Sequence, residues 1–186
     1  MIQQISKAKG IKKPEDIRKL AKLNKDAWVK EISSANPKLK DKQLISTYAS
    51  ALARKLEQEF PTIAFAAQLE REKNPVLDNH EKIVSFFTKH ENFDLMKNNV
   101  DIYLKEKKVG KKESETIREE LKSVQRVFKL IPHYGKTYAL LNEKINSAQS
   151  IVAIGETQFV KEIAPKTGLT EKEAKDIYRK AEKKIR

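Results

Sequence analysis

Cysteine is absent from this chain of 186 residues, and no apolar run approaches the roughly 20 residues that a membrane-spanning helix requires. The missing cysteine excludes a disulfide scaffold, a zinc site made of cysteines and a thiol nucleophile. The first residues are too charged to contain the apolar region of a signal peptide. We therefore expect a chain that neither spans a membrane nor enters the secretory route through its own N-terminal residues.

Glycine is scarce as well, with five residues, and none of them belongs to a phosphate-binding loop or a nucleophile elbow. The three histidines, His80, His90 and His133, are far apart in the sequence and lack the spacing of a helical metal motif. We therefore expect no cofactor, no metal site and no catalytic residue.

Two pairs of carboxylates lie close enough in the sequence to suggest acid–base partners, Glu119 with Glu120 and Glu70 with Glu72. General acid–base catalysis requires such groups to be desolvated in a concave pocket. In lysine-rich helical segments, carboxylates are far more often surface charges. We therefore expect that this protein is not an enzyme.

Positive charge dominates, because 39 lysines and arginines stand against 26 aspartates and glutamates, which gives a formal net charge of +13. This balance is typical of proteins that bind nucleic acid or a membrane surface. In nearly every basic stretch, however, lysines alternate with acids at helical spacing, as in residues 112–115 and 171–173. The alternation favours solvated helix faces over a phosphate-binding patch.

Helical periodicity recurs along the chain, whereas strand patterns and hairpin turns are lacking. Two predicted long helices each carry an apolar stripe. One stripe consists of Ile117, Leu121, Val124, Phe128 and Ile131, and the other of Leu44, Tyr48, Ala51, Leu52, Lys55 and Leu56. We predict an all-α chain of roughly eight to eleven helices.

Start and stop signals indicate where the helices begin and end. Residues 78–81 and 170–173 match the capping box, in which two side chains three residues apart bond each other's backbone N–H. The prolines at 14, 61 and 75 are suited to helix entries or breaks. Gly110 and Gly168 are predicted to stop helices.

An internal repeat joins the two ends of the chain. Residues 20–32 match residues 151–163, and, after a loop that differs by one residue in length, residues 39–51 match residues 169–181. The aromatic positions of the two copies are Trp28 and Phe159. Each copy is predicted to form a helical corner, in which the aromatic residue fills the angle and a longer helix closes over it.

These patterns predict a multi-helix domain in which two copies of the helical corner flank a central helical region. The predicted boundaries are residues 1–59 for the first copy, 60–142 for the central region and 143–186 for the second copy. The resulting domain is either compact or elongated.

The corner also has features of a helix-hairpin-helix unit, which holds a phosphate on backbone N–H groups at a helix start. Lys166 and Lys172 lie near that position in the second copy, and Gly10 with Lys12 and Lys13 in the first. The tight glycine hairpin of such units is missing from the sequence. A tandem nucleic-acid-binding module is therefore the alternative interpretation.

Several short motifs occur in an order that matches a known family. They are Phe60-Pro61-Thr62 with Phe65 and Ala66, Asn92-Phe93-Asp94-Leu95, Val100-Asp101 with Tyr103 and Leu104, residues 121–130 with Tyr134, residues 147–151, Gly155 with Phe159, and Ala174 with Tyr178 and Ala181. Over about residues 10–182, the chain resembles the N-terminal α-helical region of the A component of insecticidal toxin complexes (Tc toxins), relatives of the virulence plasmid A proteins.

The resemblance implies a piece of a much larger protein, whose family forms pentameric homo-oligomers that bind target cells, form a pore and translocate a toxic enzyme. It implies that this region is structural scaffold in the shell around the channel, without catalytic residues. The implied partners are other regions of the parent chain, further copies and toxin-complex subunits, in a secreted or cell-surface virulence complex made in the cytoplasm. A nucleic-acid-binding module and a protein-interaction adaptor are the alternatives.

Overall fold

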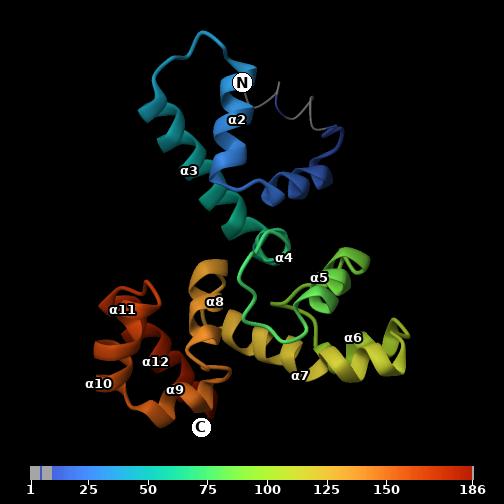
Figure 1. Cartoon of the computed structure of the whole chain (residues 1–186), viewed down its shortest axis with the longest axis vertical. Helices are drawn as coiled ribbons and strands as arrows, with labels where there is room; N and C mark the ends of the chain where they lie inside the picture. The colour runs from blue at the N-terminus through green and yellow to red at the C-terminus, as the bar shows by residue number, and fades with distance from the viewer. Residues whose placement is uncertain (1–4, 6–9, 186) are drawn as a thin grey trace. The chain divides into compact units, whose positions relative to one another are not determined.

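The structure is a computed structural model that describes residue 5 and residues 10–185 of the chain. All regular secondary structure in these residues is helical, without a strand, which confirms the predicted all-α class (Figure 1). None of the described helices is both long and apolar enough to cross a membrane. The chain divides into two units, Met1–Arg71 and Glu72–Arg186.

The helices of the first unit begin where local sequence signals place them. They are η1 (Pro14–Lys22, a 3-10 helix), α2 (Lys25–Ala35), α3 (Lys42–Glu59) and α4 (Pro61–Glu70). Pro61 occupies the first position of α4, where the absent N–H would have no helical partner. The side chains of Asn24 and Asp41 cap α2 and α3, because each accepts a hydrogen bond of 2.9 Å from a backbone N–H of the first turn.

Trp28 occupies the centre of the first unit and is 1% exposed. It packs in one apolar cluster with Ile5, Leu20, Ile32, Ile45 and Ala49. Burial of an indole of this size removes about 150–250 Å² of surface from water, which makes Trp28 the main apolar contribution of this corner.

Helix α4 belongs to the first unit because it packs on η1 and α3. Its Phe65 and Leu69 are fully buried, and the Arg71 guanidinium donates a hydrogen bond of 2.8 Å to the carbonyl of Lys22. The observed division therefore falls after Arg71, whereas the sequence analysis placed boundaries after residues 59 and 142.

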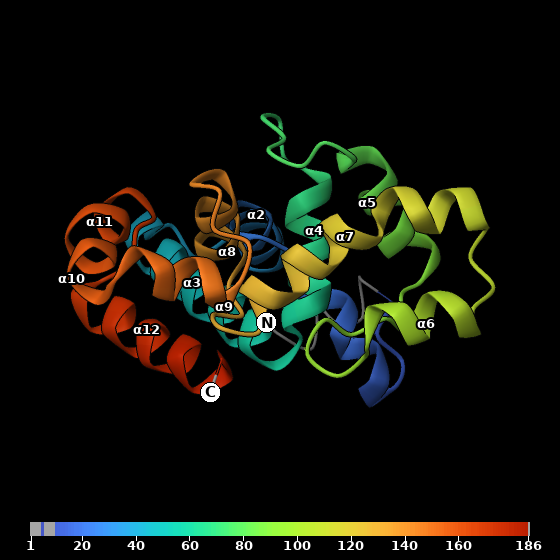
Figure 2. The same ribbon diagram turned by 90° about the horizontal axis from the view of Figure 1, so that it is seen from below.

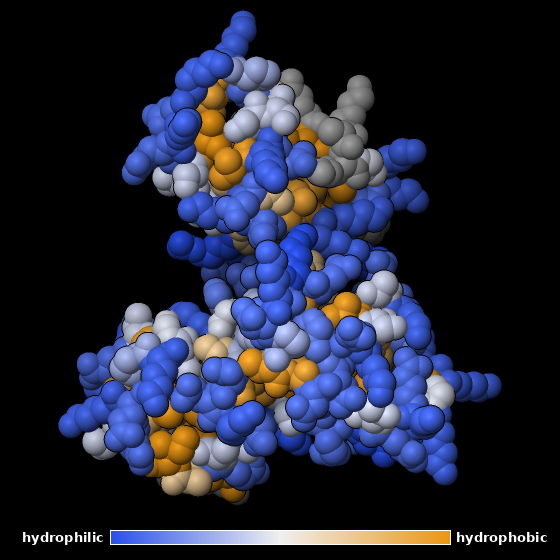
Figure 3. All heavy atoms as spheres, in the orientation of Figure 1, coloured by the Kyte–Doolittle hydropathy of each residue, from blue (hydrophilic) through white to orange (hydrophobic). Residues whose placement is uncertain are grey.

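The second unit begins with a long loop and then continues through short and long helices. They are α5 (His80–Lys89), α6 (Val100–Glu106), α7 (Lys111–Phe128), α8 (Tyr134–Asn142), α9 (Ala148–Ile154), α10 (Glu156–Gln158), η2 (Phe159–Ile163, one π-helical turn), α11 (Ala164–Lys166) and α12 (Glu171–Ile185). On the face that Figure 3 shows, hydrophilic residues cover most of the surface of each unit.

An aromatic cluster joins α5, α6 and the loop between them. Phe86 lies edge-on to Phe93, with ring centroids 5.1 Å apart, and Phe93 in turn lies edge-on to Tyr103 at 4.8 Å. The ring of His90 lies tilted against that of Phe86, with the ring centroids 4.8 Å apart. Edge-to-face contacts of this kind stabilise by about 0.5–1.5 kcal/mol each beyond burial of area.

Helix α7 confirms the predicted apolar stripe over its whole length. Ile117, Leu121, Val124 and Phe128 are all fully buried. Ile131, the fifth predicted member, lies beyond the last helical residue and packs against the core of the α9–α12 corner. The apolar periodicity of the sequence therefore extends beyond the last residue of the helix, Phe128, to Ile131.

The residues predicted to form the second copy of the repeat fold into a corner of helices α9 to α12, and Figure 2 shows α12 alongside α9. Phe159 is fully buried at its centre, as Trp28 is in the first copy. Gly168 follows α11 with a φ of +66°, and the next N–H bonds back to the carbonyl of Ala164 at 3.0 Å. Gly168 therefore stops this helix as predicted, since glycine adopts positive φ at little cost.

The third helices of the two copies match in a register that differs from the predicted one. The side chain of Thr170 caps α12 as Asp41 caps α3, so Asp41 corresponds to Thr170 and not to Glu171. The loops of the two copies therefore differ by two residues, and the predicted difference of one residue is wrong. In this register Ile45 corresponds to Ala174 and Ala49 to Tyr178, and all four side chains are buried.

The apolar stripe predicted for α3 is wrong in part. Ile45 and Ala49 make its buried face, whereas Leu44 is 53% exposed and Ala51 is exposed as well. Tyr48, Leu52 and Leu56 of the predicted stripe are partly buried and pack against the same cluster as Ile45 and Ala49.

Two of the predicted helix signals act differently from expectation. The capping box at 78–81 does not form, because Asn79 precedes α5 without a side-chain cap. Gly110 precedes α7 and does not stop a helix. Helix α6 ends at Glu106 and α8 at Asn142, and in each case the second residue after the helix, Lys108 or Lys144, has a positive φ, of 49° and 62°.

Candidate functional site

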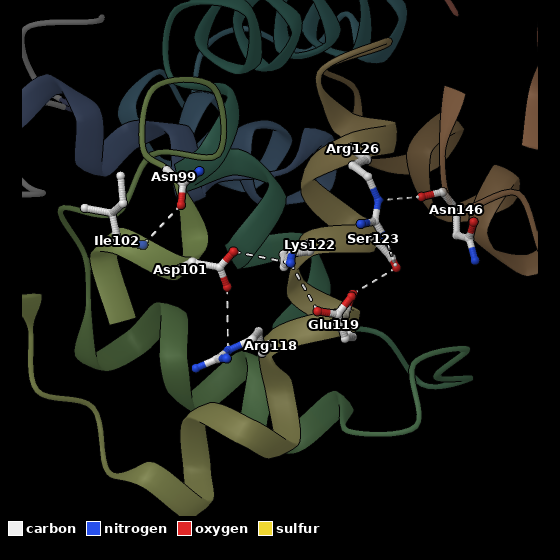
Figure 4. Close-up of polar contacts among 9 residues, drawn as sticks. All are labelled: Asn99, Asp101, Ile102, Arg118, Glu119, Lys122, Ser123, Arg126 and Asn146. Carbon is white, nitrogen blue, oxygen red and sulfur yellow. Dashed lines mark hydrogen bonds and ion pairs between the residues drawn. The ribbon is translucent and has the colours of Figure 1, made fainter. Parts of the chain in front are cut away.

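A row of charged and polar side chains runs along the exposed face of α7 (Figure 4). Asp101, on the first turn of α6, lies 3.6 Å from Arg118 and 3.2 Å from Lys122. Lys122 also lies 3.1 Å from Glu119 on its own helix. The hydrogen bonds to Glu119 and Asp101 raise the pKa of Lys122. The network therefore joins α6 to α7 by charge.

The row continues toward α9 through Arg126. Its Nη2 donates a hydrogen bond of 2.9 Å to the hydroxyl of Ser123, and its Nε donates one of 3.2 Å to the carbonyl of Asn146. Asn146 lies in the segment that leads into α9. Arg126 thus holds α7 against the segment that leads into α9, so its role is structural.

A basic groove of about 550 Å³ runs between α6 and α7 beside this row. Lys105, Lys108 and Lys111 line it, and they form no ion pair with any residue in the described part of the chain. A second open groove of about 690 Å³ at the start of α7 shares Lys111. Carboxylates line the grooves as well, Asp101 and Glu119 in the first and Glu81 and Glu113 in the second, so the unpaired ammonium groups are the feature that could attract an anion.

The three histidines are not brought together. His133 caps α8, His80 begins α5, and His90 lies in the aromatic cluster, where burial lowers its pKa. Among the residues that the structure describes, no three carboxylate or imidazole groups are grouped so as to hold a metal ion.

The carboxylates that sequence spacing paired have separate structural roles. Glu120 accepts hydrogen bonds from the N–H groups of Asp78 and Asn79, at 2.5 and 2.9 Å, and thereby caps the entry to α5 from a different helix. Glu119 faces Lys122 instead. This cross-helix cap could not be recognised from the sequence, because more than 40 residues separate its two partners.

Glu72 likewise forms hydrogen bonds within the second unit. It accepts a hydrogen bond of 2.8 Å from the hydroxyl of Tyr134, and the N–H of Asn74 donates another at 3.1 Å. The hydrogen bond from Asn74 and that from Tyr134 both lower the pKa of Glu72, while burial raises the pKa of Tyr134. These contacts hold the loop before α5 against α8.

The backbone positions that a helix-hairpin-helix unit would offer to phosphate are already occupied. In the first copy, the N–H groups of Lys12 and Lys13 both donate to the carboxylate of Asp16 at 3.3 Å. In the second copy, Thr170 and Glu173 form the predicted capping box, with hydrogen bonds of 2.9 and 3.2 Å. Each helix start therefore uses its own side chain where a phosphate would bind.

The predicted phosphate-binding lysines lie apart from the basic groove. Lys166, at the end of α11, is 3.8 Å from Glu143, and Lys172 is exposed on the first turn of α12. The sequence analysis did not identify the lysines of the groove as candidate site residues, although lysines are dense in residues 105–112 and such runs are typical of anion-binding patches.

Comparison with family models, curated proteins and solved structures finds no match for this chain.

Proposed function

We propose that this chain is a non-enzymatic, structural helical region of a protein like the A component of Tc toxin complexes. One observation carries the proposal: most of the apolar residues through which the sequence resembles that family are buried in this fold. A resemblance located in a core concerns architecture, because core residues are selected for packing.

The apolar members of the resemblance are buried throughout the chain. The side chains that are at most 8% exposed include Phe65, Phe93, Leu95, Val100, Tyr103, Leu104, Leu121, Val124, Phe128, Tyr134, Ile151, Phe159, Ala174, Tyr178 and Ala181. All of them except Phe65 of α4 belong to the second unit, where they come from α6, α7, α8, α9, η2, α12 and the loop before α6. The resemblance therefore concerns mainly the packing of the second unit.

The polar members have structural partners as well. The buried amide of Gln125 donates to the carbonyls of Leu95 and Asn98, at 2.9 and 2.8 Å. The hydroxyl of Ser147 caps α9, and Gly155 has a φ of +85° at the turn that follows. This arrangement supports a scaffold, since the polar residues stabilise turns and helix ends.

The mechanism at this level is mechanical. In each unit helices pack around an apolar cluster, and the lysine-rich surface favours solubility of the proposed assembly. In the proposed context, the partners are other regions of a longer parent chain, further copies in a homo-oligomer and the toxin-carrying subunits. Secretion and virulence belong to that whole complex.

The decisive experiment is mass spectrometry of the natural polypeptide in the source cells. Peptides that flank residues 1–186 and belong to one very long product are the expected result. A natural product that ends near Arg186 would refute the proposal.

A duplex-binding module is the competing proposal, and the unpaired lysines of the basic groove favour it. It requires an affinity for duplex DNA that falls steeply with salt, by about 10³-fold or more between 50 and 200 mM for six or more phosphate contacts. Lys105→Ala with Lys108→Ala tests the groove, and Lys166→Ala with Lys172→Ala tests the helix-hairpin-helix positions. Absence of binding at low salt removes this function altogether.

A further inference from the structure

The groove between α6 and α7 carries more positive charge than the carboxylates of its own lining neutralise. Asp101, one of its two carboxylates, pairs with Arg118 and Lys122 at 3.6 and 3.2 Å (Figure 4). Glu119, the other carboxylate, pairs with Lys122 at 3.1 Å. The remaining cations of the lining are Lys105, Lys108 and Lys111. Three ammonium groups therefore have no opposite charge within the groove.

We call Lys105, Lys108 and Lys111 the groove lysines. All three are exposed, and none forms an ion pair with a residue that the structure describes. They belong to residues 105–112, which contain five lysines and one glutamate. This segment therefore lacks the alternating acids that neutralise lysines along α7 and α12.

The backbone fixes the positions from which the groove lysines extend. Lys105 belongs to the last turn of α6, Lys108 follows that helix with a φ of +49°, and Lys111 is the first residue of α7. The N–H of Lys108 bonds to the carbonyl of Lys105, and that of Val109 to the carbonyl of Leu104, both at 3.1 Å. Leu104 is 2% exposed and anchors the turn in the core. Binding of a ligand would therefore order side chains only, which limits its entropic cost.

The direction of the side chains separates the lysines of this turn. The ammonium group of Lys107 lies 5.8 Å from the centroid of the Tyr103 ring, and Lys107 is not part of the groove lining. Its neighbour Lys108 has the same charge and lines the groove. The pair therefore provides a comparison of two adjacent lysines, of which one faces the groove.

The size and the charge of the groove fit a small, multiply charged anion. Its volume of about 550 Å³ lies within the range of about 300–1,000 Å³ that is typical of small-molecule sites. Phosphate groups concentrate negative charge and acceptor oxygens in a small volume, and an ammonium group binds them as a point charge. A duplex would instead require unpaired cations over a longer surface, where the lysines of α7 alternate with acids.

We infer that the groove between α6 and α7 binds a small ligand with at least two linked phosphate groups, such as a diphosphate or triphosphate. The groove lysines supply the binding charge, while Arg118 and Lys122 stay paired with Asp101. This site is additional to the proposed scaffold function and does not depend on it.

The test is isothermal titration calorimetry of the 186-residue chain with sodium tripolyphosphate, at an ionic strength of about 50 mM to limit screening. Replacement of all three groove lysines by glutamine should weaken binding by about tenfold or more, because each charge-assisted hydrogen bond contributes to affinity. The matched control replaces Lys38, Lys40 and Lys42, which are exposed in the first unit, and should weaken binding by less than about twofold. An equal loss in the two triple variants would overturn the inference, since binding would then follow net charge alone.

Single substitutions in the turn test the position of the ligand. Lys108→Gln should weaken binding by about threefold, and Lys107→Gln by less than about 1.5-fold, because the Lys107 ammonium group lies over Tyr103. Equal effects of the two substitutions would place the phosphate outside the groove and refute the inference.

Two further titrations identify the class of ligand. Citrate carries carboxylates in place of phosphates and should bind about fivefold or more weakly than tripolyphosphate. Equal affinity for citrate, or no measurable binding of tripolyphosphate, would overturn the inference. Tighter binding of a short DNA duplex than of tripolyphosphate, lost in the groove variant, would also overturn it and would support the duplex-binding module. None of these outcomes alters the scaffold proposal, which is tested by the length of the natural polypeptide.

Discussion

Gln125 offers the sharpest test of how the second unit holds together. Its side chain is 8% exposed on α7, and its amide nitrogen donates hydrogen bonds to the carbonyls of Leu95 and Asn98, at 2.9 and 2.8 Å. Both carbonyls belong to the loop between α5 and α6. This one amide therefore pins the loop that carries Phe93 into the aromatic cluster.

The substitution Gln125→Glu keeps the size of the side chain and removes both donors. A buried group left without its hydrogen bond costs about 1–3 kcal/mol, and a carboxylate facing two carbonyl oxygens adds to that cost. We expect the free energy of unfolding to fall by about 3 to 5 kcal/mol. Urea unfolding followed by circular dichroism measures the change, and hydrogen exchange should show faster exchange in residues 94–103.

The matched control is Gln158→Glu. Gln158 donates to Glu162 at 3.1 Å on an exposed helix face, so the same change there should cost about 0.5 kcal/mol or less. If the two variants unfold at the same urea concentration, or if exchange in the loop is unchanged in Gln125→Glu, the structural role assigned to Gln125 is wrong.

Three further predictions test the repeat, the caps and the helix ends. Trp28→Ala and Phe159→Ala should each lower the free energy of unfolding by roughly 3 to 5 kcal/mol, as large core truncations do, and unchanged thermal stability in both variants would refute the repeat. The pKa of Glu173 is lowered to about 2, chiefly by the hydrogen bond from Lys136 and next by that from the Thr170 backbone. The contribution of its carboxylate to the free energy of unfolding is therefore fully present above the ordinary pKa of 4.5 and is lost as the pH falls toward 2. Glu173→Gln should therefore destabilise at pH 7 by about 1 kcal/mol, reduced by solvent screening because the side chain is 37% exposed, and the difference from the unsubstituted chain should vanish in denaturation experiments near pH 2. Lys108→Gly and Lys144→Gly should each raise the free energy of unfolding by roughly 0.5 to 1 kcal/mol, and with it the Tm, because glycine adopts positive φ without the strain of a side chain. A lower Tm in both variants would contradict this reasoning.

The sequence by itself determined the local structure of this protein. The period of Ile117, Leu121, Val124 and Phe128 predicted α7 and its buried stripe, because neighbouring turns of one helix must present the same face to a core. The capping box at residues 170–173 and the stop at Gly168 were also predictable. Each of these signals involves residues within a few positions of one another.

Tertiary structure alone decided the features that join distant residues. Glu120 caps the entry to α5 from another helix, and Gln125 bonds a loop some 30 residues away, so no local pattern indicated either role. The choice of the buried face of α3 depended on where η1, α2 and α4 pack, which is why Leu44 and Ala51 lie outside the core although their spacing is that of a core stripe. The periodicity of the sequence indicates that a helix has an apolar face, whereas the packing of the other helices decides which of its apolar residues are buried.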